Sequence, residues 1–184
     1  MRPDHQRFKR VVAALYCSVA LFGAAQAATL DELFADLAVA TQENQARISS
    51  QIIDEWAKSG SPAMDLLLQR GKDAIEAGEP DVAIDHLSAL IDHAPEFAEG
   101  YHSRATAFFL TGRLGPALED LRQTLVMNPR HFGAMQGVAV ILEQLERPED
   151  ALEAYRAVLA LHPASPEMRD AVARLEQQLE GQAL

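Results

Sequence analysis

Residues 98–131 read AEGYHSRATAFFLTGRLGPALEDLRQTLVMNPRH, and the spacing of small residues and proline in this stretch recurs on both sides of it. Proline occurs at positions 95, 129 and 163, at intervals of 34 residues, and alanine keeps the same interval at 83, 117 and 151. A fixed period of about 34 residues is typical of a stacked array of helix–turn–helix units. The sequence therefore predicts an extended binding surface rather than an enclosed active-site cleft.

The periodic alanines have a packing role. Two paired helices approach closely only where one of them presents a small side chain, and Gly71, Ala105 and Ala139 offer the facing gap. One helical turn after each alanine comes a larger residue: leucine at 87, leucine at 121 and tyrosine at 155. We expect these side chains to fill the space beside the gap. Each second helix is expected to end shortly before its proline, which cannot continue a helix.

This pattern resembles that of the tetratricopeptide repeat family, whose motif is W-x2-L-G-x2-Y, then A-x3-F, then P. Arginine occupies positions 70 and 104, where leucine is usual, and we expect each stem to pack there while its guanidinium reaches water. The resemblance covers about 100 of the 184 residues. The matching positions in three successive units are Leu67, Arg70, Gly71, Ala74, Ala83, Leu87 and Pro95; Tyr101, Arg104, Ala105, Phe108, Ala117, Leu121 and Pro129; and Met135, Val138, Ala139, Leu142, Ala151, Tyr155 and Pro163.

The predicted fold class is all-α, a right-handed superhelical α-α solenoid of three tetratricopeptide repeats with a helical cap at each end. The N-terminal cap is expected to cover the first repeat, since a bare terminal repeat would expose its apolar face. Trp56 lies in an apolar stripe of that cap, and we interpret it as a core residue rather than as a platform for a ligand. The predicted segments are an N-terminal cap at 28–63, repeats at 64–97, 98–131 and 132–165, and a C-terminal capping helix at 166–184.

Residues 1–27 are predicted to be a secretory signal peptide. Four basic residues precede an apolar stretch from Val11 to Ala25, and alanines at 25 and 27 provide the small side chains that signal peptidase requires. That stretch of about 15 residues is shorter than the roughly 20 needed to cross a bilayer, and a retained membrane anchor is the alternative. The predicted location is the periplasm of a Gram-negative bacterium, with a mature chain that begins at Ala28 and does not insert into the membrane.

Composition and motifs exclude several classes of function. The chain has 16 basic and 27 acidic residues, a formal charge of −11, and no lysine or arginine cluster after residue 10, so it lacks the basic patch of a nucleic-acid binder. Its only cysteine, Cys17, lies in the predicted signal. Carboxylates such as Glu119 and Asp120 are interpreted as lying in first turns and on exposed faces of helices.

Catalytic, cofactor and metal sites are not predicted either. The sequence contains no glycine-rich phosphate loop, nucleophile elbow or His-Glu-x-x-His motif, so an enzyme on this helical scaffold has no residue set in support. His86 and His93 could share one face of a helix, but no third ligand accompanies them at a recognisable spacing. Zinc sites need three or four converging ligands.

The resemblance implies that a ligand lies in the concave groove lined by the first helix of each repeat. Some members of the family hold a C-terminal carboxylate there, but of the matching positions (Leu68, Lys72, Ser103, Gly133 and Gly137) only Lys72 is positively charged. The predicted function is therefore an adaptor or scaffold that binds another peptide or partner segment. The alternatives are a self-assembling homo-oligomer, or inner helix faces that are only solvated. The predicted groove residues are Leu68, Lys72, Ile75, His102, Thr106, Phe109, Gln136 and Val140.

Overall fold

A computed structural model describes residues 29–182, and within that range the chain folds into nine α-helices without a strand. The predicted signal peptide, residues 1–27, lies outside the described residues. In the described part of the chain, no helix combines the length and the apolar character needed to span a bilayer. The helices are α2 Leu30–Ala38, α3 Gln45–Trp56, α4 Pro62–Glu76, α5 Pro80–His93, α6 Ala98–Leu110, α7 Leu114–Met127, α8 Phe132–Gln144, α9 Pro148–Leu161 and α10 Pro166–Gln182.

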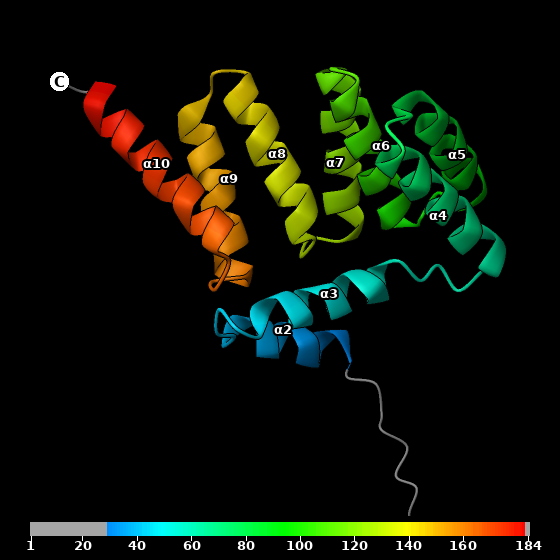
Figure 1. The fold of residues 1–184 in the computed structure, drawn as a ribbon, viewed down its shortest axis with the longest axis horizontal. Helices are drawn as coiled ribbons and strands as arrows, with labels where there is room; N and C mark the ends of the chain where they lie inside the picture. Colours follow the sequence, from blue (N-terminus) through cyan, green and yellow to red (C-terminus); the bar gives the residue numbers. More distant parts are fainter. Residues whose placement is uncertain (1–28, 183–184) are drawn as a thin grey trace, which may run out of the picture.

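Six of these helices form three consecutive hairpins, α4–α5, α6–α7 and α8–α9, which stack into a superhelix (Figure 1). Each hairpin packs on the next one, and α10 packs on α9 at the end of the array. Proline opens α4, α5, α9 and α10, because its fixed φ suits the first turn of a helix and its missing N–H costs nothing there. The predicted all-α superhelix is confirmed.

Small residues let the helices of each hairpin approach closely, as the 34-residue pattern predicts. Ala83, Ala117 and Ala151 are fully buried. At Gly71 an added Cβ would lie 2.5 Å from Cγ of Leu87, so the leucine occupies the space that the glycine leaves. Side chains of Leu68, Leu87 and Leu90 complete the core of the first repeat.

The N-terminal helices α2 and α3 form a fourth hairpin, which begins with the capping box of Thr29 and Glu32. Its apolar side does not cover the first repeat, so that prediction is wrong. The five buried residues of α2 and α3 instead share one core with α8, α9 and α10 of the third repeat and its cap. The hairpin therefore lies across the open side of the array (Figure 1). These five residues are Leu33, Phe34, Leu37, Ile48 and Ile52.

Arg104 also departs from the sequence-based expectation. Its guanidinium does not end in water but donates two hydrogen bonds to the carboxylate of Asp120, at 2.8 and 2.9 Å, and a third to Ser88 Oγ at 3.1 Å. Asp120 is only 5% exposed, so it does not lie on an exposed face as interpreted above. This ion pair joins α6 to α7, and the contact with Ser88 extends it to α5.

Candidate partner-binding site

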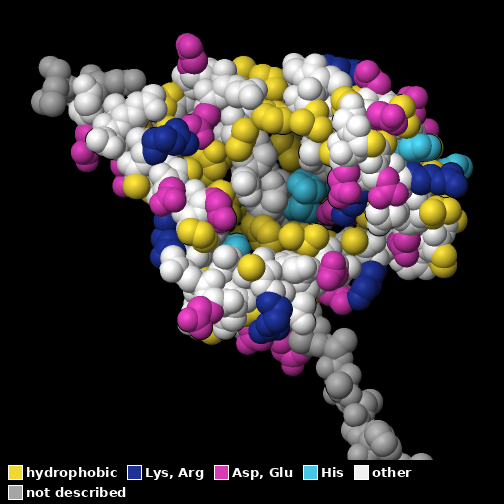
Figure 2. Space-filling model, viewed as in Figure 1, with side chains coloured by type: hydrophobic (Ala, Val, Ile, Leu, Met, Phe, Trp, Pro, Cys, Tyr) yellow, Lys and Arg dark blue, Asp and Glu magenta, His cyan; other side chains and the backbone are white. Residues whose placement is uncertain are grey.

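The concave side of the array contains a pocket between α6 and α8, with a volume of about 190 Å³. Figure 2 shows the corresponding hollow in the middle of the molecule, with hydrophobic and histidine side chains in its wall. Five of the eight predicted groove residues line this pocket: His102, Thr106, Phe109, Gln136 and Val140. The remaining wall is formed by Ala105, Leu121, Gly133, Gly137 and Ile141.

The shape of the pocket follows from residue size along α8. Gly133 and Gly137 are one turn apart and carry no side chain, so His102 and Leu121 pack directly on this face of the helix, 3.2 and 3.1 Å from where the Cβ atoms would lie. The buried side chains of Leu121 and Ile141 make the floor apolar, while Thr106 and Gln136 are exposed. Sites for drug-sized molecules usually enclose about 300–1,000 Å³, so this smaller pocket suits one large apolar side chain of a partner.

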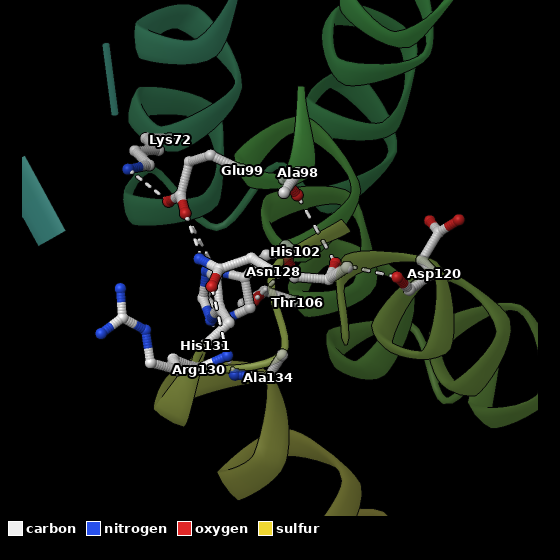
Figure 3. A network of polar contacts seen from close by, with 11 residues as sticks. Lys72, Ala98, Glu99, His102, Thr106, Asp120, Asn128, Arg130, His131 and Ala134 are labelled. Carbon is white, nitrogen blue, oxygen red and sulfur yellow. Dashed lines mark hydrogen bonds and ion pairs between the residues drawn. The ribbon is translucent and has the colours of Figure 1, made fainter. Parts of the chain in front are cut away.

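The three predicted groove residues of α4 do not reach this pocket. Leu68 is only 3% exposed and belongs to the core of the first repeat, so its prediction as a groove residue is wrong. Ile75 is half-buried against the same core. Lys72 points to Glu99 of α6, and its Nζ lies 2.8 Å from Glu99 Oε1 (Figure 3).

Glu99 is the centre of a buried polar network that the sequence did not reveal. The carboxylate is 4% exposed, and its second oxygen, Oε2, lies 3.1 Å from His131 Nε2 and 3.7 Å from His102 Nδ1. Burial raises the pKa of Glu99, but the nearby imidazole of His102, the hydrogen bond with His131 and the charge of Lys72 outweigh it and hold that pKa far below its usual range. Glu99 is therefore a carboxylate at neutral pH.

His131 connects this network to the start of α8. Its Nδ1 accepts a hydrogen bond from the backbone N–H of Ala134 at 3.0 Å, so the imidazole is the N-cap of the helix. Because Nδ1 is the acceptor, Nε2 carries the proton of the neutral ring and donates to Glu99. The ring is 2% exposed, and this burial lowers the pKa of His131 against the opposing effect of Glu99.

Glu99, His102 and His131 each present one ligand atom, and these atoms lie within 4.8 Å of one another. Three ligands are the minimum for a zinc site. The three residues do not fit a zinc site. When one nitrogen of a histidine binds a metal, the other normally donates a hydrogen bond. In His131 the other nitrogen, Nδ1, accepts one from Ala134, and Nε2 carries the proton. The ammonium of Lys72 places a further positive charge beside the same carboxylate. We therefore interpret the cluster as a charge network, which includes neither His86 nor His93.

Trp56 of α3 stacks on the other side of this network. Its ring lies 4.2 Å from that of His131, centroid to centroid, with the planes 18° apart, and it also contacts Phe34 and Phe132. The residue packs against the core shared by the N-terminal hairpin and the third repeat. This position agrees with the interpretation of Trp56 as a core residue.

The sequence matches the family model described as "Tetratricopeptide repeat" over residues 68–118 and 115–166, which is more than half of the chain. The protein therefore belongs to the tetratricopeptide repeat family. A TPR repeat-containing protein of Rhizobium etli is 34% identical over 153 residues, which cover 83% of this chain and 75% of that protein. DnaJ homolog subfamily C member 3 of Mus musculus is 27% identical over 122 residues, covering 64% of this chain and about a quarter (24%) of that protein.

Solved structures share the fold at lower sequence identity. The first TPR of Spaghetti (RPAP3), bound to the HSP90 peptide SRMEEVD, superposes with a TM-score of 0.61 at 24% identity, over 64% of this chain and 93% of that one. MamA superposes with a TM-score of 0.60 at 17% identity, over 74% of this chain and 84% of that one. These likenesses show the fold.

Proposed function

We propose that this protein is an exported protein-interaction module whose concave face binds a segment of a partner protein. The observation that carries the proposal is the apolar pocket between α6 and α8, which is open to a side chain and lies where the family resemblance implies a ligand-binding groove. The first TPR of RPAP3, which has a similar fold, binds an HSP90 peptide, and the similarly folded TPR2B domain of yeast Sti1 forms a complex with pHsp70. A partner segment with one large apolar anchor fits this pocket.

The charges of the inner face select against an acidic partner segment. Lys72 is already paired with the buried Glu99, so it does not offer a free cation to an incoming carboxylate. The formal charge of the whole chain is −11, which repels acidic peptides over a distance of roughly one Debye length. Lys72 is therefore not available to the carboxylates of a peptide such as SRMEEVD. We propose that the partner segment is neutral or basic around its apolar anchor.

Selection of peptides from a displayed random library, followed by calorimetric titration, tests this proposal. Thr106→Phe fills the pocket from an exposed position, and we expect it to weaken binding of selected peptides by about tenfold or more. Gln144→Phe is the matched control, because it adds the same ring at an exposed position of α8 that does not line the pocket. Equal loss in both variants, or in neither, would contradict the pocket as the anchor site.

Export is tested separately by sequencing the N-terminus of the protein isolated from the periplasmic fraction of its host. We propose cleavage between Ala27 and Ala28, because small residues at positions 25 and 27 match the requirement of signal peptidase. A chain that begins at Met1 and fractionates with membranes would instead indicate a retained anchor.

A further inference from the structure

The α2–α3 hairpin, residues 30–56, lies beside the concave surface to which we assign partner binding, although none of its residues lines the α6–α8 pocket itself. Gln136 of α8 lines the pocket between α6 and α8 and also a second pocket on the other side of α8. That second pocket is bounded by Ser49 and Ile53 of α3 and by Val158 of α9. An occupant that extends from the first pocket past Gln136 to the second therefore meets α3.

The hairpin is held by few polar contacts outside its apolar core. Arg130 forms an ion pair with Asp31 of α2 at 2.6 Å, and its guanidinium lies over the ring of Phe34 at 4.3 Å from the centroid. Gln45 of α3 is hydrogen-bonded to the imidazole of His162. The Arg130–Asp31 pair is largely exposed, and such pairs contribute little to stability.

The chain between α3 and α4 is short, turns at Gly60, and is tied to the start of α4 by hydrogen bonds from Ser59 to Asp65. Residues 57–61 connect the two helices, and Gly60 has a φ of +80° with no atom near the position of a Cβ. After this turn α4 packs on α5 and α6. The hairpin and the repeats can therefore separate without breaking a helix.

We propose that the α2–α3 hairpin is a lid over the partner-binding groove, and that protonation of His131 releases it. This inference rests on the proposed function of the groove. The stack between Trp56 of the lid and the imidazole of His131 is the point where a change of charge acts on the lid.

Protonation of His131 disturbs the contacts on both sides of the ring. A proton on Nδ1 would face the Ala134 N–H that Nδ1 now accepts at 3.0 Å, so two donors would oppose each other. The positive end of the α8 dipole also disfavours a cation at the N-cap. The imidazolium must therefore turn away from this position, which removes the surface on which Trp56 stacks.

The charged groups around His131 decide the direction of the pH response. Glu99 and His102 of α6 face the ring, Lys72 of α4 neutralises Glu99, Arg130 is adjacent in the chain, and α3 contributes the uncharged Trp56. Glu99 alone favours the imidazolium, but burial dominates and lowers the pKa of His131. Burial also lowers the pKa of His162, the second histidine at the lid.

Opening the lid exposes both imidazoles, so the open form binds protons more readily than the closed form. Acidification from about pH 7 to about pH 5, across the ordinary range of histidine, therefore shifts the equilibrium towards the open lid. Glu99 stays ionised in this interval because its pKa is held far below its usual range.

Hydrogen–deuterium exchange of the full chain at about pH 7 and about pH 5, corrected for the intrinsic rates, tests the lid. We expect protection in α2 and α3 to fall by about tenfold or more on acidification, equivalent to one pKa unit, while α4–α7 keep their protection. His131→Asn should reduce the pH response to the part that His162 contributes, since asparagine can cap α8 but does not titrate in this range. His93→Asn, which replaces an exposed histidine at the end of α5, should retain it.

Protection of α2 and α3 that is unchanged at the lower pH would overturn the proposal. Simultaneous loss of protection in all helices would also overturn it, as would an undiminished response in the His131→Asn variant. Failure of the proposed function appears in a different measurement, because no selected peptide would then bind to the α6–α8 pocket at either pH. The exchange experiment contains no peptide, so its outcome does not depend on that result.

Discussion

Trp56, the only tryptophan of the chain, stacks on the imidazole of His131 with ring centroids 4.2 Å apart and ring planes 18° apart. This contact joins the α2–α3 hairpin to the N-cap of α8 and, through His131, to the buried carboxylate of Glu99. The hairpin, the third repeat and the polar network are therefore one connected unit. We therefore expect a change in the charge of that network to weaken or strengthen its contact with the hairpin.

The close contact between Gly71 and Leu87 gives a prediction about the fold. Gly71→Ala places a Cβ 2.5 Å from Leu87 Cγ, so the helices of the first repeat must move, and we expect the free energy of unfolding to fall by about 1–3 kcal/mol. Gly115→Ala is the control, because no atom lies within 4 Å of its Cβ position in α7. That control should be neutral or stabilising by up to about 1 kcal/mol, measured by urea denaturation. Equal effects would contradict this packing.

The buried ion pair of Arg104 and Asp120 predicts a second effect on stability. Asp120→Ala leaves the partly buried guanidinium without its bidentate partner, and we expect a loss of about 3 kcal/mol. Glu119→Ala removes the neighbouring carboxylate, which forms an ion pair with Arg122. Both side chains of that pair are exposed, so the variant should lose less than about 1 kcal/mol of stability. A thermal melt that ranks the two variants the other way would show that the Asp120 pair is not structural.

The repeats could be predicted because their information is local and periodic. Alanine, leucine and proline recur at a fixed interval, and each hairpin packs on its sequence neighbours, so one pattern determines three units. The position of the α2–α3 hairpin could not be predicted in this way. Its partners, such as Phe132 and Val158, are about 80 or more residues further along the chain, and nothing periodic connects them with Ile48 or Ile52.

The candidate site was predictable only in part, for a related reason. Thr106, Phe109 and Val140 occupy equivalent inner faces of the helices, and the register of the repeats places them together. Glu99 and His131 have no recognisable spacing, because their contact depends on how successive repeats stack. An acidic residue in the first turn of a helix usually serves the macrodipole, so the sequence alone does not distinguish a buried glutamate from that common case.

The network around Glu99 predicts a pH-dependent stability. Glu99→Gln removes the charge that neutralises Lys72, and at pH 7 we expect a loss of about 3 kcal/mol. The pKa of Glu99 is lowered in the folded protein, so the stability that its charge provides is present above its unfolded pKa and is lost as the pH falls below it. The difference between wild type and variant should therefore shrink below about pH 4.5 in urea titrations. A constant difference down to about pH 3 would show that the carboxylate charge is not responsible.

Replacement of Phe109 tests whether the pocket binds a partner, and it gives the last prediction. The ring is half-buried, lines the pocket between α6 and α8, and packs against the core of the second repeat. Phe109→Ala should weaken binding of a selected peptide by about 2 kcal/mol or more, because central aromatic residues carry much of the binding energy of an interface. Its effect on the free energy of unfolding should stay below the roughly 3–5 kcal/mol typical of a fully buried phenylalanine.

Phe108→Ala is the matched control, since this neighbour is 8% exposed, does not line the pocket and should show that full loss of stability. Calorimetric titration and thermal melting of both variants separate the two roles. A stability loss at Phe109 as large as that at Phe108, with unchanged peptide affinity, would show that Phe109 serves the core and not the partner.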